Sequence, residues 1–89
     1  MNSRTTRRFR EAFAALPAQV KQQARHAYRL FLQDPAHPSV QFKKVHATEP
    51  VYSARVGLGY RALAVRRGNE VVWFWIGSHA DYDKLLAQL

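Results

Sequence analysis

The spacing of apolar residues along the chain changes from a helical period to an extended one. Four apolar residues near the start recur at helical spacing: Phe9, Ala12, Phe13 and Leu16. They predict an amphipathic helix that ends at Pro17. Because proline suits the first turn of a helix, a second helix is predicted over residues 17–33. Its apolar stripe is Val20, Ala24, Ala27, Tyr28 and Phe31. Two prolines within residues 34–39 end this helix.

The rest of the chain is typical of short strands. Four β-rich runs cover residues 42–46, 51–57, 60–66 and 71–76. Their connections are too short for a parallel crossover, so they predict an antiparallel meander. The fourth run is apolar on both faces, which is typical of a strand inside the sheet. Ser78 and Asp81 then have the spacing of a helix capping box. The final helix has the stripe Tyr82, Leu85, Leu86 and Leu89.

These elements predict an α+β fold in a single domain over residues 1–89. Two N-terminal helices pack on a four-stranded antiparallel sheet, and a short C-terminal helix follows. We expect the helices on one face of the sheet and a partly open second face, where a functional site has room.

Composition excludes several classes of protein. The 89 residues contain no cysteine, which rules out disulfides, thiolate metal sites and a cysteine nucleophile. No apolar run approaches the roughly 18 residues of a membrane span. The basic N-terminus lacks the apolar segment of an export signal. We therefore expect a cytoplasmic protein without a membrane partner.

The charge of the chain points to a polyanionic partner. Fourteen Lys and Arg face six Asp and Glu, which leaves a net charge of +8. Residues 1–46 hold nine of the basic residues and two acids, whereas residues 47–89 hold five and four. Nucleic acid is the commonest partner of such a small basic protein, and an acidic protein is the alternative.

Residues with the chemistry of RNA cleavage are present. Cleavage needs a base near the 2′-hydroxyl, cations for the phosphate and an acid for the leaving oxygen. The candidates for catalysis are Arg61, His79, Asp81 and Tyr82, and those for RNA binding are Lys43, Lys44, His46 and Arg55. No two histidines have metal-ligand spacing with a carboxylate, so neither a metal site nor another cofactor is predicted.

Each candidate also has a structural interpretation. Arg61 is as well explained by a pairing with a carboxylate, and Arg55 by a pairing with Glu49 or Glu70. Lys43 and Lys44 point to opposite faces of their strand, so at most one can face a given site.

The two histidines and Tyr82 have alternatives of the same kind. His46 at a strand end is typical of a surface histidine, and Tyr82 belongs to the apolar stripe of the last helix. His79 begins that helix, where the helix dipole favours a neutral imidazole that can accept a proton.

Several stretches together resemble a known family. They are the Leu16-Pro17 junction, Asp34-Pro35, residues 52–61 with the sequence Tyr-Ser-Ala-Arg-Val-Gly-Leu-Gly-Tyr-Arg, and residues 76–82 with the sequence Ile-Gly-Ser-His-Ala-Asp-Tyr. In this order, over nearly the whole chain, they resemble the RelE/ParE superfamily of bacterial type II toxins. The ending with His79 is most similar to the histidine-containing branch of YafQ and HigB.

The resemblance implies a toxin that an acidic antitoxin keeps silent in a hetero-oligomer. RelE-like members cut mRNA in the ribosomal A site by 2′-hydroxyl attack, without a metal. Carried over to this sequence, Arg61 matches the arginine that stabilises the phosphate, and His79 matches the histidine that transfers a proton. Tyr82 matches the aromatic residue that stacks on a base or assists proton transfer, and Asp81 matches the neighbouring acid of some members. Lys44 and His46 match the first-strand region of the family only loosely.

One departure from RelE shifts the expected chemistry. RelE places two lysines on its second strand, where this chain has Val51, Ser53 and Ala54. We therefore expect cleavage chemistry that uses a histidine, and not the chemistry that uses two lysines. The alternatives are a ParE-like inhibitor of DNA gyrase without enzymatic activity and an inactive RNA-binding module.

Overall fold

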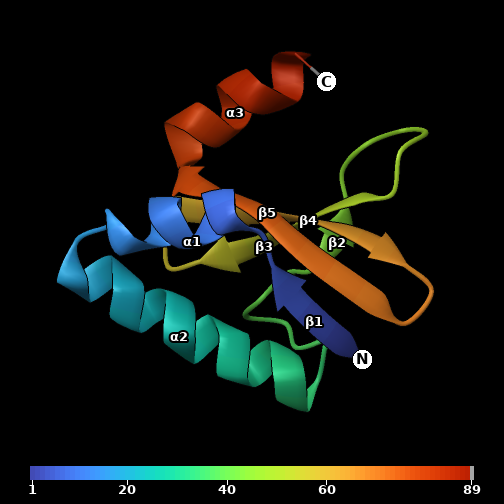
Figure 1. Ribbon diagram of the computed structural model, residues 1–89, viewed down its shortest axis with the longest axis horizontal. Coiled ribbons are helices and arrows are strands. Elements are labelled where there is room, and N and C mark those ends of the chain that lie inside the picture. The colour runs from blue at the N-terminus through green and yellow to red at the C-terminus, as the bar shows by residue number, and fades with distance from the viewer. Residues whose placement is uncertain (89) are drawn as a thin grey trace.

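The computed structural model describes residues 1–88 as a five-stranded mixed sheet with three helices (Figure 1). In chain order these are β1 Asn2–Thr5, α1 Arg7–Ala14, α2 Ala18–Gln33, β2 Lys43–Lys44, β3 Val51–Val56, β4 Tyr60–Arg67, β5 Glu70–Ser78 and α3 His79–Gln88. The strands lie in the order β1-β5-β4-β3-β2. The predicted α+β class is confirmed, and Leu89, the predicted end of the last apolar stripe, lies outside the described residues.

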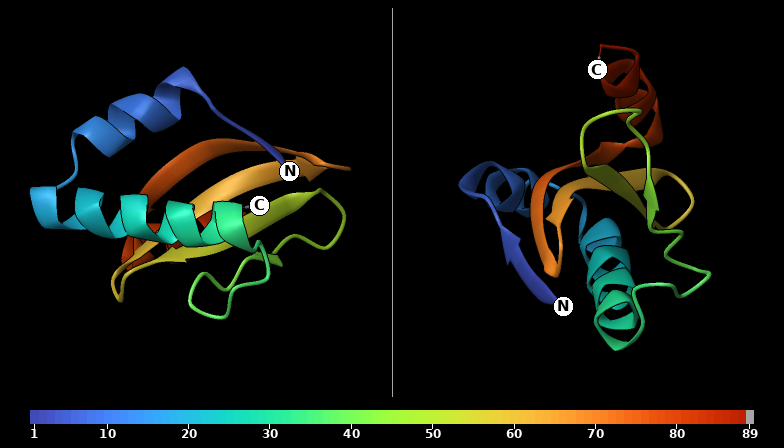
Figure 2. Two further views of the ribbon diagram at one scale, coloured as in Figure 1. Left: turned by 90° about the horizontal axis from the view of Figure 1, so that it is seen from below. Right: turned by 90° about the vertical axis from the view of Figure 1, so that its right-hand side faces the viewer.

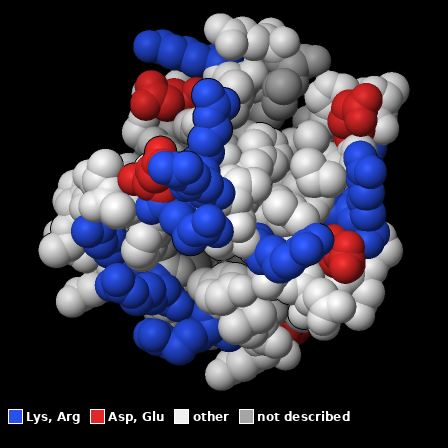
Figure 3. All heavy atoms as spheres, viewed as in Figure 1, with Lys and Arg blue, Asp and Glu red and all other residues white. Residues whose placement is uncertain are grey.

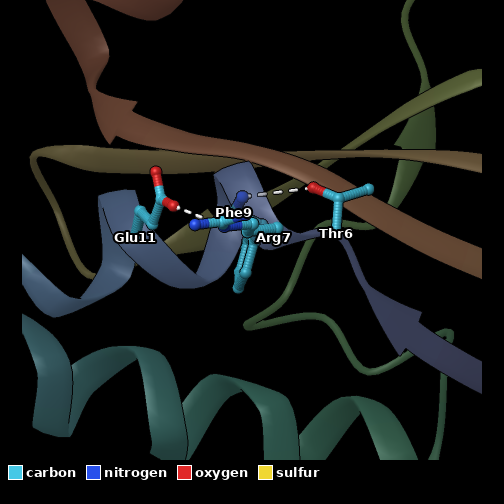
Figure 4. Close-up of polar contacts among 4 residues, drawn as sticks. All are labelled: Thr6, Arg7, Phe9 and Glu11. Atoms are coloured by element: carbon cyan, nitrogen blue, oxygen red, sulfur yellow. Dashed lines mark hydrogen bonds and ion pairs between the residues drawn. The ribbon is translucent and has the colours of Figure 1, made fainter.

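Most predicted elements are present and begin where their capping residues indicate. The second helix, the β3–β4–β5 meander and the last helix match their predicted spans closely, and β5 has a neighbour on each side. The Thr6 hydroxyl accepts a hydrogen bond from the backbone N–H of Phe9 at 3.1 Å and caps α1 (Figure 4). The Ser78 hydroxyl accepts from the N–H of Asp81 at 3.2 Å, which is half of the predicted capping box.

The prediction of four antiparallel strands was wrong at the N-terminus. β1 is a fifth strand that pairs in parallel with β5, with Ser3 opposite Val71 and Thr5 opposite Trp73. It has no apolar residue to mark it in the sequence. Its place is set by backbone pairing and by the indole N–H of Trp73, which donates to the Ser3 hydroxyl at 2.9 Å. The parallel crossover to β5 is supplied by almost the whole chain.

The strand predicted over residues 42–46 is reduced to the pair Lys43–Lys44. Gln41 has a φ of 49°, which breaks the extended backbone just before it. Phe42 instead turns its ring into an aromatic cluster, 5.0 Å from the Tyr52 ring and 4.9 Å from that of Phe31. Burial of the ring therefore takes precedence over a longer strand.

The sheet is covered on both faces, so the prediction that all helices share one face was also wrong. α1 and α2 cover one face over a core that includes Phe31, Val40 and Trp73. α3 lies on the other face, where Tyr82 packs with Val51 and Leu63 (Figure 2). Because α3 is short, it covers that face only in part.

The β3–β4 turn fixes the register of the two strands. Gly57 has a φ of +62°, a conformation that favours glycine, and a side chain there would meet the Gln23 side chain at 2.6 Å. The turn pairs Val56 with Tyr60 and so sets which residues face each other farther along the strands. No helix within residues 1–88 is long and apolar enough to cross a membrane.

Candidate functional site

Two arginines face each other on adjacent strands. Arg55 of β3 is paired with Arg61 of β4, two positions from the pair of Ser53 with Leu63. Since alternate residues of a strand share a face, both arginines lie on the side of Leu63, which is the α3 side. Lys43 of β2 is paired with Ser53 and joins the same side. We call Lys43, Arg55 and Arg61 the cationic face.

The charges of the two arginines are not neutralised. The Arg55 Nε donates to the carbonyl oxygen of Gly57 at 3.2 Å, and Arg61 Nη1 to that of Tyr60 at 3.4 Å. Within residues 1–88 neither has a carboxylate at ion-pair distance. The expected pairing of Arg55 with an acid was wrong: Glu70 instead lies 3.8 Å from Arg4 Nη2.

This arrangement is unfavourable for the fold alone. Like charges directly opposite on neighbouring strands repel each other, and both arginine side chains are half-buried. A bound anion would offset that repulsion, because both guanidinium groups could donate charge-assisted hydrogen bonds to it. The cationic face therefore has the character of a phosphate or carboxylate site.

His79 stands at the edge of this face. Its backbone N–H donates to the carbonyl oxygen of Gly59 at 2.8 Å, which ties the start of α3 to the β3–β4 turn. His79 follows Gly77 by two residues, and Gly77 of β5 is paired with Arg61 of β4. The imidazole is accessible, with 46% of the side chain exposed. His79 thus lies two residues beyond the β5 position that is paired with Arg61.

An acid beside His79 was missed in the sequence. Asp83 Oδ2 lies 3.5 Å from Nε2 of His79, one turn along α3. A carboxylate in this position can orient the imidazole. The signal was the i,i+4 spacing of His79 and Asp83. The predicted acid, Asp81, is exposed, and its backbone N–H serves to cap the helix.

Two aromatic residues flank the site in different ways. Tyr82 is 7% exposed within the α3-side core, which is the packing role left open by its sequence position. Trp75 is half-buried, and its ring lies where a side chain at Gly77 would come within 2.7 Å of it. An indole over the strand position opposite Arg61 is suited to stack on a base, a role that its place in an apolar run concealed.

Lys44 and His46 hold the loop that follows β2. The Lys44 ammonium donates to the carbonyl oxygens of His46 and Ala47 at 2.8 and 3.1 Å. His46 Nδ1 accepts from the backbone N–H of Thr48 at 3.2 Å and of Glu49 at 2.9 Å. Lys44 is paired with Tyr52 and so lies on the opposite face from Lys43, as strand alternation predicted. Within residues 1–88 no cluster of three or more histidine or acidic side chains is arranged to hold a metal ion.

Comparison with known proteins gives the family and the fold. A family model described as a ParE-like toxin domain matches residues 18–84. Among proteins with curated descriptions, none matches significantly.

Several solved structures are similar to this chain, and RelE and YafQ are among them. RelE in the RelB–RelE complex from Methanococcus jannaschii has a TM-score of 0.72 at 12% identity, over 91% of this chain and 95% of that one. YafQ from Escherichia coli has a TM-score of 0.69 at 10% identity, over 91% and 96%. The intact RelBE complex of E. coli gives 0.65 at 16%, over 85% and 93%. At these identities the likeness establishes a RelE-like fold.

Proposed function

Because the chain belongs to the ParE-like toxin domain family, we propose that it is the toxin of a type II toxin–antitoxin system and cleaves ribosome-bound mRNA in the cytoplasm. The observation that carries the ribonuclease activity is the opposed pair Arg55 and Arg61, un-neutralised and half-buried beside an accessible histidine. Among the similar structures, two archaeal complexes and one from E. coli join RelE to RelB, which supports an antitoxin partner.

The cleavage proposed is an attack of the 2′-hydroxyl on the adjacent phosphate. The 2′-oxygen bonds to phosphorus as its proton leaves, the bond from phosphorus to the 5′-oxygen breaks, and the 5′-oxygen receives a proton. His79 carries one of these two proton transfers, and Asp83 positions its imidazole. This chemistry is the one implied by the resemblance to RelE-like toxins, with no metal required.

The phosphate gains negative charge during the attack, and in this proposal Arg55 and Arg61 stabilise that charge. Preorganised cations act most strongly on a charge that develops in the transition state. Arg61 and Arg55 supply two guanidinium groups from neighbouring strands. Lys43, exposed at the edge strand β2, extends the cationic face along the RNA backbone. Trp75 offers its ring to a base beside the scissile phosphate.

Primer extension on a defined mRNA, with and without translating ribosomes, tests the proposal. We expect cuts in the presence of ribosomes and a loss of about 10²-fold or more in rate for His79→Ala. Arg61→Ala should lose about 10²- to 10³-fold, by analogy with removal of one oxyanion donor. His26→Ala is the matched control, because His26 is an exposed histidine on α2. A His79→Ala variant that cuts at the parental rate removes the role of His79.

A gyrase inhibitor is the second candidate. The matching family model is named for ParE-like toxins. The buried ring of Tyr82 also weakens the argument that this residue marks a ribonuclease. Protein that arrests growth, leaves mRNA intact with ribosomes and inhibits supercoiling by purified gyrase would establish this candidate instead.

A further inference from the structure

A β-bulge turns two successive aromatic residues of β5 to the same face of the sheet. Leu63 of β4 is paired with Trp75, and the next residue of β4 is paired with Trp73. Phe74 therefore has no partner across the two strands. Phe74 and Trp75 both pack against the α3-side core, whereas Trp73 belongs to the core under α1 and α2. The bulge thus adds a second half-buried ring to the side of the sheet that carries the cationic face.

Phe74 lines an open hollow near the β4–β5 turn, which we call the β5 hollow. The hollow has a volume of about 430 Å³. Its apolar lining includes Val65 and Val72, which are paired with each other across β4 and β5. Val51, which belongs to the α3-side core, is paired with Val65 on the other side, so the hollow lies on the α3 side of the sheet. The remaining lining residues are Arg4, Thr6, Arg67 and Glu70.

The charges around the β5 hollow leave one cation without a counter-ion. Within residues 1–88 Arg67 has no acid at ion-pair distance, although Glu70 faces it in the strand register. The Glu70 carboxylate instead lies 3.8 Å from Arg4 Nη2. Toward the β4–β5 turn, at the right of Figure 3, basic and acidic side chains lie next to each other. An exposed ion pair of this kind contributes little, so a ligand can displace it, and two arginines with one acid leave the hollow positively charged.

An aromatic ring beside an uncompensated arginine suits a nucleotide of single-stranded RNA. A base can stack on the ring while a guanidinium holds its phosphate, and proteins that bind single strands combine these two contacts. A small anion without a flat ring would use Arg67 and leave Phe74 exposed to water. Double-stranded RNA keeps its bases stacked on each other and out of reach of the ring. Glu70 can accept a hydrogen bond from an exocyclic amino group of a stacked base.

The β5 hollow also continues the cationic face along β4. Arg61 and Arg67 are both on the α3 side, because an even number of positions separates them on one strand. At about 3.3 Å per residue, the two positions are about 20 Å apart, a distance that several nucleotides of an extended strand cross. Trp75 is paired with Leu63, between the two arginines. One RNA strand can therefore contact both regions.

We propose that the β5 hollow is a nucleotide subsite for single-stranded RNA, in which Phe74 stacks on a base and Arg67 holds the adjoining phosphate. The inference rests on the proposed function and adds that the protein grips the RNA several nucleotides away from the cleaved bond. A strand held at two separated points is fixed in position over the cationic face. Phe74 and Arg67 bind the substrate and take no part in the proton transfers.

Binding of uncleavable oligonucleotides to the intact protein tests the inference. The probe is a single-stranded 2′-O-methyl RNA of about ten nucleotides, a length within the range that single-strand binding domains cover. It lacks the attacking hydroxyl, so binding is measured without cleavage. A second probe is an abasic chain of the same length, which keeps the phosphates and has no bases. Dissociation constants of both probes are measured by fluorescence anisotropy over a range of salt concentrations.

The two contacts of the β5 hollow predict different losses. Phe74→Leu keeps an apolar side chain and removes the ring, so it should weaken binding of the RNA about tenfold and leave the abasic chain unaffected. Arg67→Gln should weaken binding of both probes. It should also reduce the slope of log affinity against log salt by about 0.7, the value for one phosphate contact on a single strand. Because Arg67 is exposed, its variant keeps the test decisive if Phe74→Leu is destabilised.

Two matched controls separate the β5 hollow from the general charge of the protein. Tyr28→Leu removes a ring that is 38% exposed on α2, and Arg8→Gln removes an exposed arginine of α1. Neither residue lines the hollow. Both variants should change the dissociation constant of the RNA by less than about threefold, within the scatter of distant sites. Circular dichroism and thermal unfolding show that each variant is folded.

Several results would overturn the inference. They are no binding of the RNA by the parent protein, unchanged affinity of folded Phe74→Leu and Arg67→Gln, an equal loss for the abasic chain in Phe74→Leu, or losses of the same size in the controls. The outcome is independent of catalysis. The expected losses in a protein that cuts no mRNA support the subsite and refute the ribonuclease proposal, whereas cleavage of mRNA without these losses does the reverse.

Discussion

The opposed arginines give a stability prediction that distinguishes anion binding from a structural role. Arg61→Gln removes one of two like charges that face each other and keeps a long side chain with a polar end. Like charges directly opposite on adjacent strands cost about 0.2–1 kcal/mol. The hydrogen bond that the change removes, to the carbonyl oxygen of Tyr60, is long at 3.4 Å and contributes little. We therefore expect the variant to be more stable by about 0.5 kcal/mol.

Thermal unfolding measures this gain. In a domain of this size 1 kcal/mol moves Tm by about 4–8 °C, so Tm should rise by about 2–4 °C at low ionic strength. The gain should shrink when salt rises from about 0.1 M to about 1 M, because screening weakens the repulsion. Phosphate should raise the Tm of the parent protein more than that of the variant, since the parent has both arginines to bind it.

Arg29→Gln on α2 changes the same residue type at an exposed position outside any strand pair, and its Tm should stay close to that of the parent. A structural arginine would behave in the opposite way. If Arg61→Gln lowers Tm at both salt concentrations, the fold depends on the Arg61 side chain and the argument for an anion site fails.

Three further substitutions test the packing around the two faces. Phe31→Ala removes a ring that is 1% exposed and should cost about 3–5 kcal/mol in urea unfolding; a loss below about 1 kcal/mol would contradict the aromatic core. Gly77→Ala places a Cβ 2.7 Å from the Trp75 ring and should cost about 1–3 kcal/mol, with altered Trp fluorescence; an unchanged Tm and spectrum would show that the ring does not lie over Gly77. Ser3→Ala removes the hydroxyl that accepts from Trp73 and should cost about 1 kcal/mol, with faster amide exchange in β1; unchanged exchange there would show that backbone pairing alone holds the strand.

Elements with a strong local pattern were predictable, and those held by distant contacts were not. The stripe of α2 and the alternation in the meander are local, so the sequence revealed both. β1 is polar, four residues long and paired with a strand near the other end of the chain. The side of the sheet that α3 covers depends on the direction in which β5 ends. Neither fact is present in any short window of the sequence.

Part of the candidate site was predictable from the sequence, and part was not. His79 and Arg61 stand out because of their neighbours in the chain, but the facing of Arg61 and Arg55 depends on a register that the β3–β4 turn sets in three dimensions. Lys44 has the charge of an RNA ligand, yet its ammonium holds two carbonyl groups of its own loop. Asp83 was visible by its spacing from His79, although nothing in the sequence showed that the acid would reach the imidazole.

Part of the basic residues that give the net charge of +8 gather in two separate regions of this fold. On the α3 side, cations lie on strands, half-buried and close together, where they suit a compact anion such as one phosphate. On the α1–α2 side, Arg4, Arg10 and Arg25 line an apolar space between the two helices. Because the sheet lies between these two regions, an anion held by Arg55 and Arg61 is remote from the arginines on the α1–α2 side.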